Sequence, residues 1–441
     1  MKKNVVKALS LLTSILLIVV ITACGNENSS NSGSDSSSDD SATGGKVSIT
    51  LMEKYSDPVE KLPLDYALAE LKEEFPNVEV RIEPMPRDSG QKLKVLAASG
   101  NLPDIFHLEG AQAEVFYKSG SLLQLDEYVA DTELESKMKP QAFESLKGTD
   151  GHIYYLRTEN SDNGLLFINK DLFAQNNVKI PGNYDELLEA VKVFHSKDIL
   201  PMAIFAKEKW PGLTFFDMFL SREVPTGYKA LVDGSISAND PLVLKAAQKE
   251  LELVNSGLIS KSAFTTSYDD AFALFSSGKA AMLPNGSWVT KDMYDKMGDS
   301  VDFLLPSVFA DGEKAETTKV NAVGGGGSYV GIGVSANTKN KEVTAKFAAA
   351  LALKLNEGFT VKNGAPTTIL KENPVYEGTL DPLSQKKNDY VETIETMSIF
   401  DWEFTDIKVK TAVGDATEKL LGGFVTVEEF IKQLEKAVET K

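Results

Sequence analysis

Hydrophobic and polar positions follow two alternating periods over the first part of the body of the chain. A period of two, as in residues 47–52, predicts a strand, and apolar residues at helical spacing, as in 62–75, predict a helix. The predicted order is strand, helix, strand, helix, strand over 47–52, 62–75, 78–82, 88–98 and 104–107. Such alternation predicts an α/β fold with a parallel or mixed sheet covered by helices.

The same pattern continues to the end of the chain. Further strands are predicted over 165–168, 280–283 and 329–334, and further helices over 184–195, 271–275, 341–355 and from Val427 onward. In sheets of this kind, ligands bind outside the carboxyl ends of the strands. The segments that follow the strands, such as 53–55 and 108–110, are therefore candidate site positions.

The first 45 residues have a different pattern. Lysines at 2, 3 and 7 precede an apolar run over 11–21, which is shorter than the roughly 20 residues of a membrane span. Small residues then lead to Cys24, so residues 1–23 are predicted to be a signal peptide. The order Ile-Thr-Ala-Cys at 21–24 resembles a bacterial lipobox, which implies cleavage before Cys24 and lipidation of its thiol. Residues 24–45 are almost wholly small and polar, which predicts a lipidated flexible tether.

Composition narrows the classes of function. The net charge of −18 repels phosphate backbones, so we expect no nucleic-acid partner. Cys24 is the only cysteine, which excludes an intrachain disulfide and a cysteine metal cluster. With three histidines in 441 residues, a histidine-rich metal site is also excluded, and we expect neither a metal nor a cofactor.

Five short motifs carry a resemblance to a known family. They are LPDIF at 102–106, INKDLF at 168–173, SGKAAM at 277–282 with NGSW at 285–288, GGGG at 324–327, and YVGIGVSANTK at 329–339. In this order they resemble the extracellular solute-binding proteins of ABC importers, the cluster that includes maltose-binding protein and Gram-positive multiple-sugar-binding lipoproteins. The resemblance implies a two-lobed fold of the periplasmic-binding-protein type (type II), with a hinge that the chain crosses several times.

The same resemblance implies where the lobes lie and how the protein works. The N-terminal lobe is expected to comprise 46–157 and 325–375, and the C-terminal lobe 158–324 and 376–441. A monomer on the extracellular face of a Gram-positive membrane would capture an oligosaccharide, with an α-glucan as the candidate type, without chemical change. It would then deliver the sugar to the permease subunits of an ABC transporter.

Sugars present apolar C–H faces, which stack on flat rings, and hydroxyls, which bind carboxylates and amides. Trp210, Trp288 and Trp402 are the only tryptophans, and all three lie in predicted loops. Trp288 follows a predicted turn at 285–286, so its ring is expected to project from the end of the sheet. The resemblance supports a platform role most strongly for Trp288 and least for Trp402.

Polar candidates come from the loops around the same strands. They are Glu53, Tyr55, Glu109, Glu159, Asp162, Asn163, Asn285 and Asp401, and the crossing segment adds Gly326 and Tyr329. Each could equally be a solvated surface group, and the sequence leaves open whether Glu159 or Asp162 faces the ligand.

Other functions stay open from sequence alone. A glycosidase would need two carboxyls roughly 5–9.5 Å apart, which a sequence does not show. A receptor for a polyol phosphate, a peptide or a metal chelate is a second alternative, although no arginines cluster near the predicted loops. A purely structural lipoprotein would explain Cys24 but not the lobe pattern. The glycine run at 324–327 is not read as a phosphate loop, because no Gly-Lys-Ser/Thr follows it.

Overall fold

The computed structural model describes residues 46–86, 88, 90–148, 150–159, 162–312, 322–327, 330–404 and 406–439. The predicted signal peptide, the tether with Cys24, and Tyr329 lie outside these described residues.

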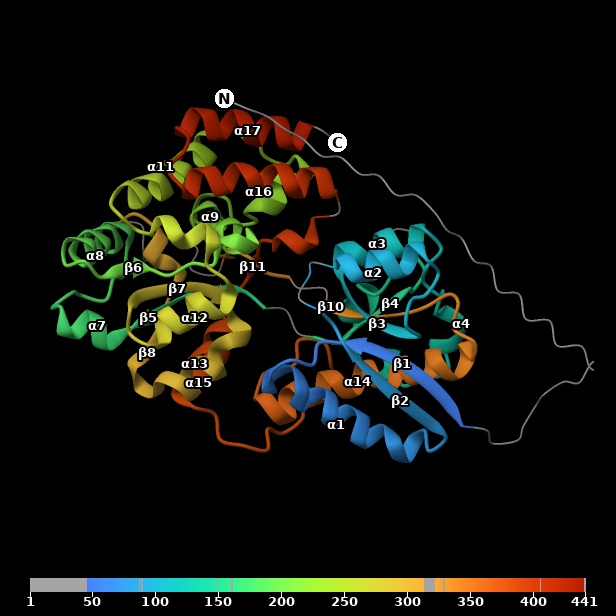
Figure 1. Ribbon diagram of the computed structural model, residues 1–441. Helices are drawn as coiled ribbons and strands as arrows, with labels where there is room; N and C mark the ends of the chain where they lie inside the picture. Colours follow the sequence, from blue (N-terminus) through green and yellow to red (C-terminus); the bar gives the residue numbers. More distant parts are fainter. Residues whose placement is uncertain are drawn as a thin grey trace, which may run out of the picture. The chain divides into compact units, whose positions relative to one another are not determined.

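The first sheet is mixed and has the strand order β2-β1-β3-β10-β4 (Figure 1). Its strands are β1 (Val47–Glu53), β2 (Val78–Pro84), β3 (Ile105–Glu109), β4 (Tyr155–Arg157) and β10 (Val330–Val334). β1 runs parallel to β2 and β3, whereas β10 runs antiparallel to β3 and β4. Alternate residues of β1 enter different cores: Ile49 and Leu51 pack into one, and Met52 packs into the other.

Two helices that are distant in sequence pack together against this sheet. They are α1 (Pro58–Glu74) and α14 (Lys341–Asn363), which lie side by side in Figure 1. Asp57 caps α1 by accepting a hydrogen bond from the Glu60 amide at 3.1 Å. The α/β expectation from the alternating pattern is confirmed.

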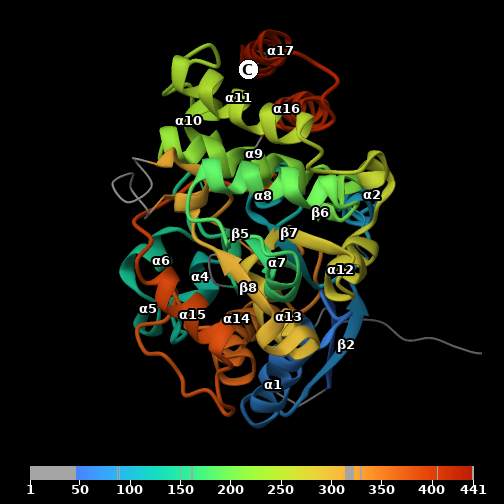
Figure 2. The same cartoon turned by 90° about the vertical axis from the view of Figure 1, so that its left-hand side faces the viewer.

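The second sheet has the order β6-β7-β5-β8, with β5 (Gly164–Asn169), β6 (Leu200–Met202), β7 (Ala280–Gly286) and β8 (Val301–Leu304). All six residues of β5 are buried, so both of its faces meet hydrophobic cores. α9 (Trp210–Glu223) is buried almost throughout. α11 (Pro241–Asn255), α16 (Ile407–Leu421) and α17 (Val427–Glu439) pack together, and the first two also pack on α9 (Figure 2).

The remaining described elements are short. The α-helices are α2 (Gln91–Ala98), α3 (Gly110–Lys118), α4 (Asp126–Val129), α5 (Leu134–Lys137), α6 (Pro140–Glu144), α7 (Lys170–Gln175), α8 (Tyr184–Ser196), α10 (Tyr228–Asp233), α12 (Tyr268–Ser276), α13 (Thr290–Met297) and α15 (Pro382–Val391). The 3₁₀ turns are η1 (Ala206–Glu208), η2 (Lys261–Thr265), η3 (Ser287–Val289), η4 (Gly298–Ser300), η5 (Pro306–Phe309) and η7 (Asp401–Glu403), and β9 (Ala322–Val323) pairs with β11 (Thr396–Met397).

The chain passes between the two sheets more than once. It leaves the first sheet after β4 and enters the second at β5, then returns between β9 and β10. After α14 it leaves the first sheet again and reaches α15, which packs against α13. A bridge between Asn163 and Gly326 pairs the first two passages. Within the described part of the chain, every helix falls short of the length and apolarity that crossing a membrane requires.

Several local expectations differ from the structure. β7 continues through Asn285 and Gly286, which pair with Leu165 and Gly164, so these two residues do not form a turn. Trp210 is the first residue of α9 rather than part of a loop, because the following proline favours a helix start there. The helix predicted from residue 88 begins at Gln91, although the Asp88 carboxylate still accepts a hydrogen bond from the Lys92 amide at 2.9 Å.

Candidate functional site

All three tryptophans meet in one place, which we call the aromatic cluster: Trp210, Trp288, Phe400 and Trp402. The Trp210 ring centroid lies 5.7 Å from that of Trp288 and 5.6 Å from that of Trp402. Phe400 stacks on Trp402 at 4.3 Å with an angle of 19° between the ring planes. Phe400 is buried while the three indoles are half-buried, so the cluster is anchored in the core and keeps part of its tryptophan surface accessible.

The surrounding elements fix the tryptophan rings. Trp210 begins α9, and its ring lies 5.1 Å from that of Phe205. Its indole nitrogen donates a hydrogen bond to Glu208 Oε2 at 3.2 Å. The Trp288 ring lies directly on Gly286, where the Cβ of any other residue would overlap the ring. A glycine at the end of β7 is therefore what allows Trp288 to pack at this position.

Asp401 places a carboxylate beside the cluster. Its Oδ2 lies 3.2 Å from Lys410 Nζ. Burial raises the pKa of Asp401, Lys410 opposes that rise, and the nearby Glu109 carboxylate adds to it. The indole nitrogen of Trp402 is buried and has no hydrogen-bond partner among the described residues. A ligand hydroxyl could satisfy this donor.

The end of β1 contributes a second group of charges. Glu53 is buried at the last position of the strand, and its Oε1 lies 2.5 Å from Nδ1 of the buried His107 on β3. Lys54 Nζ lies 3.7 Å from Glu159 Oε1. Burial lowers the pKa of Lys54, but the carboxylates of Glu159, Glu109 and Glu53 outweigh it, so the net shift is upward.

Glu159 and Asp162 lie on the passage from the first sheet to the second. Burial raises the pKa of both carboxyls, and nearby cations oppose that rise. Lys54 acts on Glu159, and Lys387 and Lys54 act on Asp162. Asp162 Oδ1 also accepts a hydrogen bond from the Ser287 hydroxyl at 2.6 Å, directly before Trp288. Glu159 and Asp162 therefore both lie in the region of Lys54, close to the segment that carries Trp288.

Two buried amides lie beside this passage. The Asn163 amide N–H donates to Ser287 Oγ at 3.2 Å, and the Ser287 amide donates to the Asn163 carbonyl at 2.8 Å. Asn163 Oδ1 and Asn285 Nδ2 are buried without a hydrogen-bond partner among the described residues. Polar atoms in this condition are suited to a polar ligand or an ordered water.

Five charged side chains of this region act on one another electrostatically, and we call them the polar ring: Lys54, Glu109, Glu159, Asp162 and Asp401. Lys54 pairs with Glu159, and Asp162 accepts a hydrogen bond from Ser287, the residue before Trp288. The Trp288 ring contacts that of Trp402, which follows Asp401. The charge of Glu109 raises the pKa of both Asp401 and Lys54. Lys54 and Glu109 lie at the ends of β1 and β3 of the first sheet, Glu159 and Asp162 lie on the passage between β4 and β5, and Asp401 lies in η7.

Two further predicted residues have different surroundings. The Tyr55 hydroxyl donates a hydrogen bond to Asp65 at 2.9 Å, and Lys61 Nζ lies 5.4 Å from the centre of its ring, so both of these contacts are with α1. Gly326 contributes backbone, since it bridges Asn163 and leaves no room for a Cβ against Met397.

Sequence reasoning missed several residues of this region. Lys54 and Phe400 are sequence neighbours of predicted residues, and that adjacency was the available signal. The pairing of His107 with Glu53 requires strands β1 and β3 to be adjacent, which the sequence alone does not show. Nothing in the sequence marks Lys387 on α15, where burial lowers the lysine pKa and Asp162 opposes that shift.

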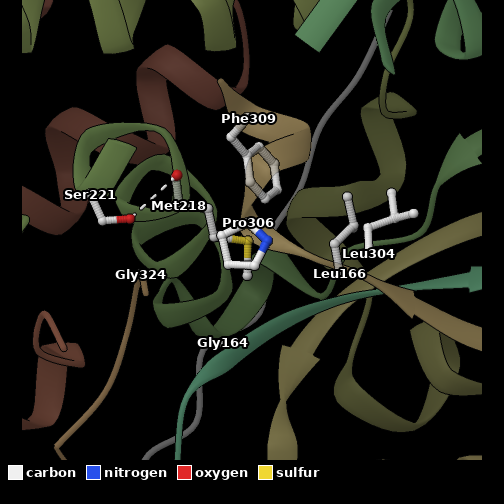
Figure 3. A pocket seen from close by; sticks show the side chains of 8 residues that line it. All are labelled: Gly164, Leu166, Met218, Ser221, Leu304, Pro306, Phe309 and Gly324. Atoms are coloured by element: carbon white, nitrogen blue, oxygen red, sulfur yellow. Dashed lines mark hydrogen bonds between the residues drawn. The ribbon is translucent and has the colours of Figure 1, made fainter. Parts of the chain in front are cut away.

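A small cavity lies elsewhere, between the second sheet and α9 (Figure 3). It is lined by Gly164, Leu166, Met218, Ser221, Leu304, Pro306, Phe309 and Gly324. The Ser221 hydroxyl donates to the Met218 carbonyl of its own helix at 3.4 Å, so the lining offers little polar recognition. We therefore assign the candidate site to the aromatic cluster and the polar ring.

The arrangement combines two kinds of surface. Half-buried indoles provide flat apolar faces, and partly desolvated carboxylates and amides provide acceptors and donors. This combination suits a molecule that has apolar C–H faces and a rim of hydroxyls.

Comparison with known proteins gives consistent matches. Residues 56–354 match the family described as bacterial extracellular solute-binding protein. An uncharacterized ABC transporter extracellular-binding protein of Pyrococcus horikoshii is 25% identical over 52% of this chain and 53% of its own length. The multiple sugar-binding protein of Streptococcus mutans is 24% identical over 74% of this chain and 77% of its own length. The chain thus spans about half of the first relative and three quarters of the second.

Solved structures agree over most of the chain. A structure from work on xylan utilization by the thermophilic bacterium Caldanaerobius polysaccharolyticus has a TM-score of 0.75 and 25% identity, covering 88% of this chain and 99% of that one. A chitin oligosaccharide binding protein has a TM-score of 0.73 and 23% identity, covering 90% and 98%.

Proposed function

We propose that this chain, which belongs to the family of bacterial extracellular solute-binding proteins, binds an oligosaccharide at the aromatic cluster and the polar ring. The observation that carries the proposal is the meeting of all three tryptophans beside partly buried carboxylates. Sugar rings stack on indoles through their C–H faces, and their hydroxyls donate to carboxylates. The buried, unpartnered atoms of Asn163, Asn285 and Trp402 would gain partners from the same hydroxyls.

The names of similar proteins support the same class of ligand. One relative is a multiple sugar-binding protein, and another, from Pyrococcus abyssi, is a maltotriose-binding protein. A similar solved structure is a chitin oligosaccharide binding protein. These names differ in the sugar, so they favour an oligosaccharide without selecting the α-glucan type expected from the sequence.

The fold is the two-lobed α/β fold of periplasmic binding proteins. We place the N-terminal lobe at 46–157 and 325–375 and the C-terminal lobe at 158–324 and 376–441. The two lobes would close about the passages between the sheets and enclose the sugar, as in other hinged binding proteins. Capture would leave the sugar chemically unchanged.

The predicted anchor gives the binding event a location. Lipidation of Cys24 and the tether over 24–45 would hold a monomer at the extracellular face of a Gram-positive membrane. The loaded form would then deliver its sugar to the permease subunits of an ABC transporter.

The proposal is tested by calorimetric titration of the full chain with maltotriose, xylotriose and chitotriose. We expect at least one to bind with a Kd near the micromolar range, about −8 kcal/mol. Chromatography of the same samples should return the sugar intact, whereas cleavage products would favour a glycosidase. Failure of all three trisaccharides, with binding of a polyol phosphate or a peptide instead, would contradict the proposal.

A further inference from the structure

A fully buried carboxylate, Asp217, lies in the middle of α9 behind the candidate site. It has no solvent exposure, and its two oxygens accept hydrogen bonds from backbone amides of two different segments. Oδ1 accepts from the Tyr228 amide at 2.9 Å, and Oδ2 accepts from the Gly325 amide at 2.8 Å. The Ser398 hydroxyl lies beside the same carboxylate and favours its charged form.

Three segments around Asp217 lead to parts of the site. α9 begins at Trp210, two helical turns before Asp217. Gly325 precedes Gly326, which bridges Asn163 next to Asp162. Ser398 precedes Phe400 and η7, where Asp401 and Trp402 lie. This carboxylate of α9, the helix that begins with Trp210, therefore lies against the crossing segment and against the segment that carries Phe400 and Trp402.

The packing around Asp217 leaves no spare room. A Cβ on Gly324 would lie 2.5 Å from the Met218 amide nitrogen, and one on Gly325 would lie 2.6 Å from Phe400 Cε1. A Cβ on Gly227 would overlap Asp217 Oδ1 and Ser398 Oγ. Small shifts of the carboxylate would consequently be passed to the crossing segment and to the Phe400 ring.

We propose that Asp217 is a positioning residue of the site, whose carboxylate holds α9, the crossing segment at 322–327 and the segment at 396–404 in register. The donors around it suit an ionised carboxylate, since two backbone amides donate to its oxygens and the neighbouring Ser398 hydroxyl favours the charged form. Its effect on sugar affinity rests on the proposed function, but its effect on the tryptophans does not.

Protonation gives this role a measurable signature. Burial raises the pKa of Asp217 to about 7, while the Gly325 amide, the Ser398 hydroxyl, the Tyr228 amide and the charge of Arg222 oppose the rise. Arg222 belongs to α9 itself, and the segments packed against Asp217 otherwise present the hydroxyl and the two amides. Below about pH 7 the carboxyl gains a proton and loses acceptor capacity, so the register should loosen as pH falls.

The test uses the intrinsic fluorescence of the full chain without sugar, because all three tryptophans lie in the aromatic cluster. In the wild type, the emission spectrum should change through a transition with a midpoint near pH 7. Asp217→Asn should remove that transition, increase acrylamide quenching, and weaken binding of whichever trisaccharide the wild type binds by about 3- to 30-fold. The matched control is Glu250→Gln, a second fully buried carboxylate in α11, which should leave emission, quenching and affinity unchanged.

A folded Asp217→Asn protein with wild-type emission, quenching and pH profile would overturn the proposal, whether or not any sugar binds. If Asp217→Asn does not fold, Ser398→Ala decides the question. Loss of the hydroxyl that lowers the pKa of Asp217 should move the emission transition to higher pH, and an unmoved midpoint would overturn the proposal.

Discussion

Trp288 contributes both to the surface of the candidate site and to its packing. Its ring lies on Gly286. The ring centroid of Trp288 is 5.7 Å from those of Trp210 and Phe400 and 6.1 Å from that of Trp402. Trp288→Ala should weaken sugar affinity by about 1–3 kcal/mol, the range of an aromatic anchor. The apo protein should lose less than the roughly 3–5 kcal/mol of a core tryptophan, because the ring is only half-buried.

Calorimetry and apo thermal melting on one preparation measure both quantities. Phe424→Ala is a matched control, since Phe424 is 68% exposed in the turn between α16 and α17. It should leave affinity unchanged. A folded Trp288→Ala protein with wild-type affinity would remove Trp288 from the site.

At the level of single residues, the sequence could predict which residue types would contact a ligand, but not which residues would contact one another. The aromatic and acidic types of Trp288, Asp162 and Asp401 were enough to mark them as candidates. The Asp162–Ser287 hydrogen bond joins residues 125 positions apart, so neither residue signals the other along the chain. The sequence does not distinguish Phe400 from other core phenylalanines, because its role depends on its stacking against Trp402 in the folded protein.

The crossing segment between β9 and β10 depends on glycine at Gly325. Its φ of +61° lies in the left-handed region, and an added Cβ would meet Phe400 and Thr214. Gly325→Ala should lower the free energy of unfolding by about 2–4 kcal/mol, from backbone strain plus overpacking, and should also weaken sugar binding.

Gly234→Ala separates strain from packing. Gly234 has a φ of +81° at the end of α10, but an added Cβ would meet nothing within 4 Å. Its alanine variant should lose only about 1–2 kcal/mol and keep full affinity. Chemical denaturation of both variants makes the comparison, and equal losses would show that Phe400 does not restrain the segment.

At the level of elements, the hydrophobic pattern predicted β1, β2, β3, β5, β7, α1, α8 and α14 but not all of their ends, and it missed α9, α11 and α16. β7 extends to Gly286 because it pairs with β5 on one side, a contact that the Asn-Gly sequence does not reveal. α14 extends to Asn363, beyond the predicted 355, because its later turns pack against α1. Tertiary pairing overrides local turn and helix signals at both places.

The whole protein is predicted to depend on Cys24 for its location. Cys24→Ala removes the thiol that lipid transfer requires, so the variant should accumulate as uncleaved precursor or be released into the medium. Fractionation with metabolic lipid labelling distinguishes these fates from the wild type. A Cys24→Ala protein that is mature in size, lipid-labelled and membrane-bound would contradict the assignment.

At the scale of the molecule, alternation of strands and helices was sufficient to predict an α/β fold, and the motif order was sufficient for the family. The arrangement of the polar ring could not be predicted, because Glu109 comes near Asp401, and Asp162 near Ser287, only after the chain has passed between the two sheets. Those passages are long-range features of topology, which local periodicity does not encode.

The most direct test of the central claim is tryptophan fluorescence during titration with maltotriose, xylotriose and chitotriose. All three tryptophans belong to the aromatic cluster, so emission reports on this site alone. We expect a saturable change in emission for the sugar that binds, with the same Kd as calorimetry and a shift to weaker binding in Trp288→Ala. Calorimetric binding of a trisaccharide with no change in tryptophan emission would place the sugar elsewhere and contradict the account.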